Sequence, residues 1–353
     1  MDQAHPFRPM RSPTLSDLPP PPTGKTGWPW TVETPPLPPA RPDGSPWPRI
    51  SIVTPSYNQG EFVEETIRSV LLQGYPDLEY IIIDGGSIDQ SVEIIRKYER
   101  WASYWVSEKD RGQSHAINKG FDRTTGILLS WLNSDDVLLP GALQAVSLAS
   151  RYFDQKMIVA GLSEFRDASG SRSLWVVDRL PRTASDIFCF FSTYLPQPSV
   201  FLTRRAFEEC GGLAEHLYYT MDLDLWLRIA EKSRIELIDR HLSWMRQHDQ
   251  AKTVQGGFRR LAEVEQVLHA HAEKFPRDIV RKTFAAARIE RSRLWVSAGL
   301  TSFQKDNKNY ARLCAYQAMR THFCTVFTRF WLGLALRVTL PRFIRAAIFQ
   351  GNI

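Results

Sequence analysis

The sequence predicts an α/β domain with a mostly parallel central sheet and a C-terminal helical extension, and three observations favour this class. From Arg49 onward, short β-rich runs alternate with amphipathic segments, which is typical of strand–helix–strand units. Polar residues follow the predicted strands at the points where those strands end. Apolar residues make up 43% of the 353 residues and charged residues 23%, which argues against a wholly disordered or membrane-embedded chain.

The alternation can be followed element by element from the first strand. Predicted strands cover residues 50–54, 79–84, 105–107 and 127–132. Predicted helices between them cover residues 61–72, 91–100 and 114–121. Because ligands of open α/β sheets bind at the carboxyl ends of the parallel strands, we expect Thr54, Asp84 and Asp135 to lie at one such edge.

The regions on either side of this domain, residues 49–253, have a different character. Residues 1–48 contain 15 of the 23 prolines and show no helical or strand periodicity, which predicts an extended or disordered lead-in that stands apart from the fold. Residues 254–353 have a helical pattern and are expected to form an accessory region, with a helical hairpin over 282–320. Within it, residues 325–340 predict a basic amphipathic helix that either lies on an anionic membrane or packs on the α/β domain.

Charge and cysteine content narrow the range of partners and compartments. The 44 Lys and Arg residues against 38 acids give a net charge of +6, which favours an anionic partner such as a nucleoside diphosphate or a membrane surface, and nothing indicates nucleic acid. The cysteines are scattered, which predicts neither a zinc site nor a disulfide framework. Prolines interrupt the apolar stretch that an N-terminal signal peptide would need, so we expect a cytoplasmic protein. A peripheral position at the inner face of the plasma membrane is compatible with that location.

Two strand-to-loop turns form the first candidate ligand site. Residues 52–58 read Ile-Val-Thr-Pro-Ser-Tyr-Asn, and residues 84–89 read Asp-Gly-Gly-Ser-Ile-Asp. Proline and glycine end strands, and a loop that opens a helix offers unpaired N–H groups to an anion. Either turn alone is equally well explained as an ordinary strand end, so the argument depends on their occurrence together.

A segment rich in hydrogen-bond donors follows the third predicted strand. Arg111, Asn118 and Lys119 are close enough in sequence to reach one anionic ligand, and the N-terminus of the helix that begins near Gln113 favours negative charge as well. The alternative is a solvated charged loop containing an Asp–Arg pair.

The fourth predicted strand ends in a run of polar and acidic residues. Asn133, Ser134, Asp135 and Asp136 follow the apolar residues 127–132. Hard cations such as Mg²⁺ or Mn²⁺ take oxygen ligands from one or two carboxylates and from substrate phosphates. We therefore predict a metal site on Asp135 with Asp136 as a helper, the alternative for Asp136 being a cap on the following helix.

Two later segments supply further candidates. Residues 220–228 predict a helix in which Asp224 has Arg228 four residues on, whereas Asp222 has Trp226 there, so Asp224 is expected in an ion pair and Asp222 at the site. Within residues 244–253, His248 is a candidate metal ligand, although a lone histidine is more often a surface residue. Candidate phosphate contacts in that segment are Arg246 and Lys252.

In this order and spacing, these segments resemble the family 2 glycosyltransferases, inverting enzymes with the GT-A nucleotide-diphospho-sugar transferase fold. The resemblance implies that one set of residues contacts the nucleobase: Thr54, Pro55, Tyr57 and Asp84. It implies that a second set lies beside the diphosphate and sugar: Arg111, Asn118, Lys119, Asn133, Ser134 and Asp136. It further implies that Asp135 holds the metal, that Asp222 is the catalytic base and that residues 244–253 close over the donor.

The sequence departs from the family pattern at three positions. Gly85 follows Asp84 where the family often has a second acid, Asn133 replaces the first acid of the metal motif, and Met221 stands where Glu is common. These departures bear on the choice of nucleobase, on the metal ligands and on the acidic pair of the catalytic helix.

The function implied is sugar transfer from a nucleoside-diphosphate sugar to an acceptor hydroxyl with inversion, using Mn²⁺ or Mg²⁺. A UDP-sugar is the first expectation for the donor, with GDP- and dTDP-sugars as alternatives. The acceptor is expected to be a glycan or a lipid-linked molecule, in surface polysaccharide assembly. A non-catalytic nucleotide-sugar-binding or glycan-binding module of the same fold remains the main alternative. A nicotinamide-dependent dehydrogenase is disfavoured because the first turn lacks Gly-x-Gly-x-x-Gly.

Overall fold

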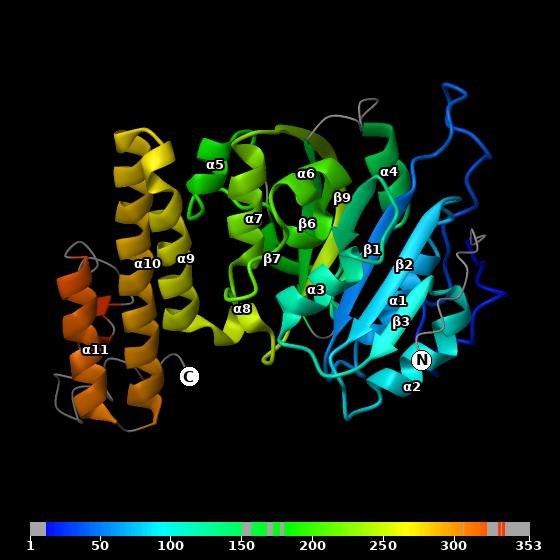
Figure 1. Ribbon diagram of the computed structural model, residues 1–353. Helices are drawn as coiled ribbons and strands as arrows, with labels where there is room; N and C mark the ends of the chain where they lie inside the picture. Colours follow the sequence, from blue (N-terminus) through cyan, green and yellow to red (C-terminus); the bar gives the residue numbers. More distant parts are fainter. Residues whose placement is uncertain are drawn as a thin grey trace. The chain divides into compact units, whose positions relative to one another are not determined.

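The computed structural model describes residues 12–149, 157–167, 172–176, 180–305, 307–322, 331–332 and 334–335. The chain divides into two compact units, Met1–Val254 and Gln255–Ile353. The first unit is an α/β domain in which the described strands form one nine-stranded sheet, and the second is helical (Figure 1). The α/β class with a mostly parallel sheet and a C-terminal helical extension is therefore confirmed.

The half of the sheet that carries the first candidate site is entirely parallel, in the order β3-β2-β1-β4. Its strands are β1 (Ile50–Ser56), β2 (Leu78–Asp84), β3 (Tyr104–Ser107) and β4 (Leu128–Trp131). The helices that connect them are α1 (Val63–Leu71), α2 (Ser91–Tyr98) and α3 (Gln113–Phe121), with a 3-10 turn at Glu99–Trp101. All four carboxyl ends consequently lie at one edge of the sheet, as the alternating sequence pattern predicts.

Strand β1 continues two residues beyond its predicted end. Its pairing with β4 stops at Val53, whereas its pairing with β2 continues through Pro55, opposite Ile83. Since the strand is paired on one side only at that point, the missing N–H of Pro55 is tolerated.

The other half of the sheet is mixed, in the order β8-β6-β9-β5, with β7 on β6. Its strands are β5 (Val137–Leu138), β6 (Met157–Asp167), β7 (Arg172–Val176), β8 (Val200–Thr203) and β9 (Arg234–Gln247). The remaining helices of this unit are α4 (Ala142–Ala149), α5 (Ala184–Phe188), α6 (Arg204–Glu209), α7 (Met221–Ala230) and α8 (Lys252–Gln255), with a 3-10 turn at Gln197–Ser199. Pairing of β5 with β9 places Val137 opposite Trp244, which brings the end of β9 beside the loop that follows β4.

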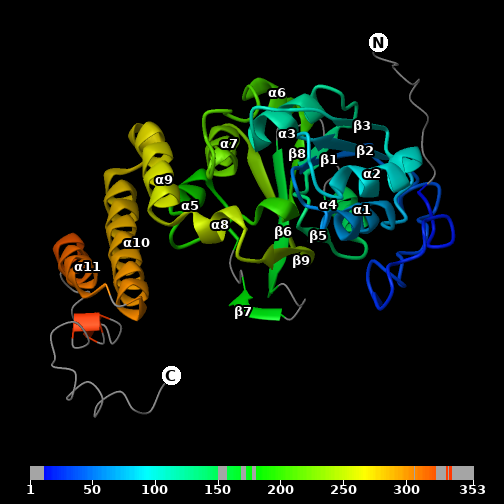
Figure 2. The same cartoon turned by 90° about the horizontal axis from the view of Figure 1, so that it is seen from below.

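Helices cover both faces of the parallel strands (Figure 2). Helices α1, α2 and α4 share one apolar cluster with the side chains of Ile52 and Ile82. On the opposite face, Gly120 of α3 lies directly against the side chains of Val53 and Ile83. A side chain at Gly120 would collide with Val53, so glycine permits the close approach of α3 to the sheet.

The expectation that residues 1–48 stand apart from the fold is wrong for their described part, residues 12–48. These residues contain no helix or strand, but Leu18 and Trp47 belong to the main apolar cluster. Arg68, a fully buried residue of α1, donates hydrogen bonds to the carbonyls of Pro19, Pro29 and Trp30. Burial of apolar side chains therefore packs this segment on the domain despite its many prolines. Its tryptophans were the signal of that burial, which the overall proline content obscured.

The second unit consists of α9 (Gly257–His271), a 3-10 turn (Ala272–Lys274), α10 (Arg277–Gln304) and α11 (Lys308–Thr321). Helices α10 and α11 form a hairpin whose small residues pack together with Leu334. The indole N–H of Trp331 donates to the carbonyl of Ala315. Apart from positions 331–332 and 334–335, the predicted amphipathic helix over 325–340 lies outside the described residues. In the part of the chain that the structure describes, every helix is too short or too polar to cross a membrane.

Candidate functional site

The loop after β4 brings together the two predicted metal ligands. Asp135 Oδ2 lies 3.0 Å from His248 Nε2, although the two residues are far apart in sequence. The pairing of β5 with β9 causes this meeting, because His248 directly follows β9. The His248 ring rests against Phe62 with ring centroids 4.8 Å apart, and its side chain is only 8% exposed. His248 is thus an enclosed residue of the site and not a surface histidine.

Asp136 has a supporting position in the same loop. Its carboxylate accepts hydrogen bonds from the backbone N–H of Arg246 and from Asn133 Nδ2, both at 3.2 Å. Burial, together with the neighbouring charge of Asp135, raises the pKa of Asp136 well above its usual range. Helix α4 begins only at Ala142, so Asp136 does not cap it. Asp136 therefore shapes the loop, and the structure does not support direct contact with a ligand.

Arg246 ties the loop to β9 and to α1. Its Nε donates to the carbonyl of Asp135 at 3.2 Å, and its Nη2 lies 2.7 Å from Glu65 Oε2. The guanidinium also stands over the rings of Phe62 and Trp244. Since the side chain is almost fully buried among these groups, the expectation of a phosphate contact from Arg246 is not supported.

Asp135 and His248 fit a divalent cation that is shared with a ligand. Across the described ranges, no three His, Cys, Asp or Glu residues are grouped so that they could hold a metal ion by themselves. A carboxylate and an imidazole nevertheless suit Mn²⁺, and Mg²⁺ commonly binds through one or two carboxylates, substrate phosphates and water. The donor set is consistent with a cation that binds together with a diphosphate.

The first two turns form one hydrogen-bonded platform. Ser87 Oγ accepts the N–H of Asn58 at 2.8 Å, and Asn58 Oδ1 accepts the N–H of Ile88 at 3.0 Å. Gly60 N–H bonds Asp89 Oδ2 at 2.8 Å. Asn58 and Gly86 adopt positive φ angles of 51° and 82°, which allow the two turns to face each other.

Of the four residues expected to contact a nucleobase, Tyr57 alone is exposed, with a relative accessibility of 61%. Thr54 is buried, and its hydroxyl accepts from Tyr80 Oη at 3.0 Å. Pro55 is buried within β1. Asp84 is also fully buried, and its carboxylate accepts hydrogen bonds from Gly86, Ser87 and Ser107. Asp84 consequently fixes the turn beneath Tyr57, and its expected direct role is not supported.

Asp110 is a candidate that sequence reasoning missed. A side-chain carbon at Gly85 would lie 2.7 Å from Asp110 Oδ2 and 3.3 Å from Tyr57 Cδ2. Asp110 therefore occupies the space beside Tyr57 that a second acid after Asp84 would need. The glycine in place of that acid was the available signal.

The segment around Arg111 divides into residues that face a hollow and residues that do not. Arg111 makes a two-pronged ion pair with Glu215, with its closest contact at 2.8 Å. Asn118 instead exchanges two hydrogen bonds of 2.9 Å with the backbone of Leu213. Lys119 pairs with Glu108. All three predicted contacts are therefore paired with protein groups, and of the three Arg111 is the one that lines a hollow.

A hollow of about 130 Å³ opens beside Arg111, at the N-terminus of α3. Gln113 connects it to the metal loop, because its side chain donates to Asn133 at 2.6 Å and accepts from Lys252 Nζ at 2.8 Å. Lys252 also lies over the ring of Tyr218, 3.9 Å from its centre. Lys252 and the helix N-terminus thus face a space next to the Asp135 loop, and Arg111 lines that space together with its ion-pair partner Glu215. Ser134, in the loop itself, is buried.

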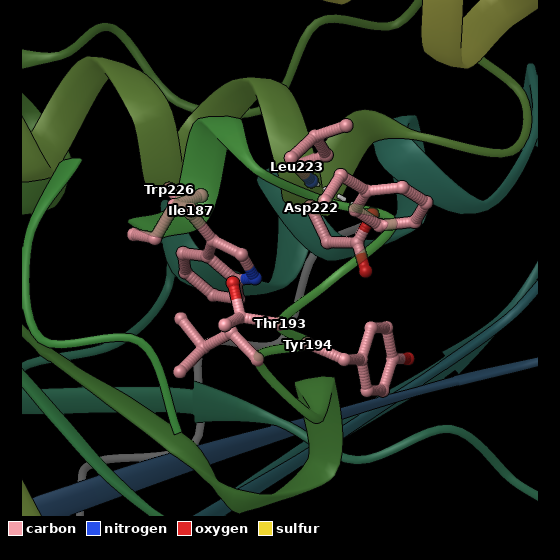
Figure 3. Close-up of a pocket in the computed structure, with 8 residues that line it drawn as sticks. Ile187, Thr193, Tyr194, Asp222, Leu223 and Trp226 are labelled. Carbon is pink, nitrogen blue, oxygen red and sulfur yellow. Dashed lines mark hydrogen bonds between the residues drawn. The ribbon is translucent and has the colours of Figure 1, made fainter. Parts of the chain in front are cut away.

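Helix α7 separates the two acids as the spacing predicts. Asp224 pairs with Arg228, the closest atoms being 2.8 Å apart. Asp222 lines a second, small hollow of about 10 Å³, together with Phe190, Tyr194 and Trp226 (Figure 3).

The residues between Leu195 and Gln197 connect this second hollow to the metal loop. Leu195 lines the hollow, and Gln197 donates to the carbonyl of Trp131 at 2.7 Å while accepting from Asn133 at 3.1 Å. Trp131 in turn stacks on Trp226 of α7, with ring centroids 5.3 Å apart. The site of Asp135 and the site of Asp222 are therefore built on one continuous set of contacts.

Known glycosyltransferases resemble this chain in sequence. Residues 51–209 match the family model described as glycosyl transferase family 2. An uncharacterized glycosyltransferase of Rickettsia typhi is 29% identical over 224 residues, which cover 62% of this chain and 70% of that protein. The putative teichuronic acid biosynthesis glycosyltransferase TuaG of Bacillus subtilis is 37% identical over 92 residues, 25% of this chain and 36% of that protein.

Solved structures share the fold at low sequence identity. The mannosyltransferase PcManGT from Pyrobaculum calidifontis, in complex with GDP-Man and Mn²⁺, has a TM-score of 0.51 and 17% identity, covering 82% of this chain and 87% of that one. S. aureus TarS has a TM-score of 0.51 and 14% identity, covering 82% of this chain and 51% of that one. The fold is therefore that of glycosyltransferases of the GT-A type. Residues 51–209 of this chain are similar to glycosyl transferase family 2.

Proposed function

We propose that this chain transfers a sugar from a nucleoside-diphosphate sugar to an acceptor hydroxyl with inversion at the anomeric carbon. The observation that carries the proposal is the continuity of the two half-sites. Asn133 and Gln197 join the loop of Asp135 to the hollow of Asp222, so that a donor at one and an acceptor at the other would meet.

The donor half offers groups for each part of a nucleotide sugar. The exposed ring of Tyr57 is suited to stack on a base, with Asp110 beside it as a hydrogen-bond acceptor. Arg111 and Lys252 supply positive charge for the diphosphate. A UDP-sugar remains the first choice, with GDP- and dTDP-sugars as alternatives, and PcManGT is a relative in fold that binds GDP-Man.

Asp135 and His248 would hold the divalent cation. A bound Mn²⁺ or Mg²⁺ supplies positive charge that stabilises the departing diphosphate. The complex of PcManGT with Mn²⁺ supports cation use within this fold. Arg246, by bonding the carbonyl of Asp135, keeps the loop in the position from which its carboxylate faces His248.

The acceptor half supplies the base. The acceptor oxygen bonds to the anomeric carbon while the bond from that carbon to the diphosphate oxygen breaks, and the hydroxyl proton passes to the carboxylate of Asp222. Attack from the face opposite the leaving group inverts the configuration. Since a single displacement needs no covalent intermediate, a separate nucleophile is not required.

A role in surface polysaccharide assembly fits this activity. The name of TuaG points to teichuronic acid biosynthesis. We extend the role from that relative to this chain as part of the proposal.

Incubation with Mn²⁺ and a panel of UDP-, GDP- and dTDP-sugars, followed by measurement of released nucleoside diphosphate, tests the proposal. We expect release from one class of donor, and loss of release in Asp222→Asn. Binding of a nucleotide sugar without any release would instead establish the non-catalytic module. If the protein neither binds a nucleotide sugar nor releases a nucleoside diphosphate, both the transferase and the non-catalytic module would be refuted.

A further inference from the structure

The two units of the chain carry net charges of opposite sign. The first unit, residues 1–254, contains 27 Lys and Arg against 32 Asp and Glu, a net charge of −5. The second unit, residues 255–353, contains 17 Lys and Arg against 6 acids, a net charge of +11. The excess of positive charge therefore comes entirely from the helical unit. An asymmetry of this kind is typical of a region that associates with an anionic polymer or an anionic membrane.

Helix α11 presents part of this charge in a regular row. Its cationic residues are Lys308, Arg312 and Arg320, and the helix contains no acid. Together with Tyr316 they recur every four residues, so their side chains follow one another along the same side of the helix. Arg312, Tyr316 and Arg320 are exposed. Because no carboxylate lies within the helix, the attraction of this row for an anion is not offset locally.

The large apolar side chains of α11 are exposed as well. The buried positions of the helix, in its hairpin with α10, hold small residues only: Ala311, Cys314, Ala315 and Ala318. Tyr310, Leu313 and Tyr316 are by contrast between 43% and 53% exposed. They follow one another at intervals of three residues, so each is a neighbour of the next on the helix surface. Single exposed apolar residues are ordinary, but three neighbours on one helix indicate a second contact surface.

This surface is separate from the one that periodicity predicts over residues 325–340. Within that segment, the Trp331 indole donates to the carbonyl of Ala315, and Leu334 is fully buried in the hairpin. These two side chains therefore contact protein. The exposed residues of α11 form a different candidate surface, which we call the outer face of α11 and which consists of Tyr310, Arg312, Leu313, Tyr316 and Arg320.

An anionic lipid surface suits every residue of the outer face. An arginine side chain can rest its alkyl stem on apolar surface while its charge remains among the lipid phosphates. Tyrosine is enriched at the boundary between membrane and water, and a helix that lies in this boundary buries its leucines. A nucleic acid would bind the cations and the rings but would leave Leu313 in water. A second copy of α11 would bring two rows of cations together, which is unfavourable.

We propose that the outer face of α11 docks this protein on an anionic membrane surface. Its arginines lie at the lipid phosphates, and its tyrosines and leucine enter the boundary region below them. The docking goes beyond the proposed sugar transfer and does not depend on it, because all five residues belong to the second unit.

Co-sedimentation of the full chain with vesicles tests the docking in the absence of any substrate. One set of vesicles contains equal parts of phosphatidylcholine and phosphatidylglycerol, and the other contains phosphatidylcholine alone. The charge variant combines Arg312→Gln with Arg320→Gln. Its matched control combines Arg281→Gln with Arg288→Gln, which removes two exposed arginines from α10 and lowers the net charge of the chain equally.

The apolar variant combines Leu313→Ala with Tyr316→Ala, since alanine keeps the helix propensity high. Its control is Ile289→Ala, at an exposed apolar residue of α10. Thermal melting shows whether each variant folds. Gel filtration and binding of a fluorescent single-stranded oligonucleotide test the two other occupants, a second copy of the chain and a nucleic acid.

We expect the wild type to sediment with the phosphatidylglycerol vesicles, less so as NaCl is raised, and not with phosphatidylcholine alone. The charge variant should bind about 30-fold more weakly, because each arginine near an anionic surface is worth ~5-fold in affinity. The apolar variant should lose ~10-fold or more through the apolar area that it no longer buries. Both α10 controls should bind within about 5-fold of the wild type, as expected for arginines farther from the lipid.

Three results would overturn the docking. The first is a wild type that sediments equally with both kinds of vesicle. The second is an equal loss in the α10 controls and the α11 variants, which would show that net charge alone is responsible. The third is the absence of vesicle binding together with a dimer, or with oligonucleotide binding, that the α11 variants abolish. That result would assign the outer face to a second copy or to a nucleic acid.

Discussion

At the scale of single residues, the donor half of the site depends on buried groups that touch no ligand. Arg246 connects β9 to two other elements. Its side chain donates to the carbonyl of Asp135 and pairs with Glu65 on α1, and its backbone N–H donates to the carboxylate of Asp136. Asp84 does the same for the turn beneath Tyr57. These residues thus position the carboxylate of Asp135 and the ring of Tyr57, which we propose contact the donor.

Replacing Arg246 with Met should weaken the donor half. The change leaves Glu65 mostly buried without its ion-pair partner and frees the Asp135 carbonyl, which should cost about 3 kcal/mol of unfolding free energy. Loss of such a positioning group typically lowers metal affinity ~10–100-fold. Melting and Mn²⁺ titration in the presence of UDP measure both effects. Arg240→Met, on an exposed part of the same strand, is the control. Wild-type Mn²⁺ affinity in Arg246→Met would contradict the positioning role.

Replacing Asp222 with Asn should separate chemistry from binding. Loss of a general base typically lowers the rate ~10²–10⁴-fold, so transfer should collapse while donor affinity persists. Asp224→Asn should mainly lower the melting temperature, because Asp224 holds Arg228, which also donates to the carbonyls of Cys210 and Gly212. Transfer at the wild-type rate by Asp222→Asn would show that another group is the base.

At the scale of elements, the described N-terminal residues 12–48 act as part of the α/β domain. Arg68 donates to three carbonyls of this segment and to Tyr98 Oη, while Trp28 Nε1 donates to the carbonyl of Leu138 in β5 at 2.7 Å. Since β5 directly follows the Asp135 loop, the contact of Trp28 with Leu138 helps to fix the position of that loop.

Arg68→Met should therefore destabilise the α/β domain strongly. It leaves three carbonyls without their donor, and we expect a loss of about 3 kcal/mol or more in the free energy of unfolding. Denaturant unfolding measures the loss. Arg96→Met, an exposed change on α2, provides the comparison. Equal stability of the two variants would mean that residues 12–48 contribute little.

The C-terminal unit allows a related test at Leu334. This side chain is fully buried against Gly299 and Cys314, so Leu334→Ala should cost ~2–5 kcal/mol in that unit. Leu332→Ala, at an exposed neighbour, should cost little. If the segment served a membrane instead, Leu334→Ala would melt like the wild type and would co-sediment less with phosphatidylglycerol vesicles.

Sequence periodicity predicted the parallel strands well because each is a local pattern with polar residues at its end. The i,i+4 spacing likewise predicted the ion pair of Asp224 with Arg228, since helical neighbours follow from sequence alone. The direction of Asn118 was not predictable, because it is set by Leu213, 95 residues away. The burial of residues 12–48 was missed for the same reason, since it depends on partners in α1 and β5.

At the scale of the whole molecule, the two half-sites are expected to act together in one displacement, the first binding the donor and the second the acceptor. Asp135 and His248 lie on the donor side, and Asp222 and Trp226 on the acceptor side, joined through Asn133 and Gln197. Variants on the two sides should consequently have different consequences. Changes on the donor side should alter binding of nucleoside diphosphate, and changes on the acceptor side should alter transfer alone.

Calorimetric titration with UDP and GDP, in Mn²⁺ and in EDTA, tests this division most directly. The wild type and Asp222→Asn should bind one of the two nucleotides equally well in Mn²⁺ and lose that binding in EDTA. Asp135→Ala should bind weakly in both conditions. Wild-type binding that is the same with and without EDTA, or an Asp135→Ala variant that keeps cation-dependent binding, would contradict the account.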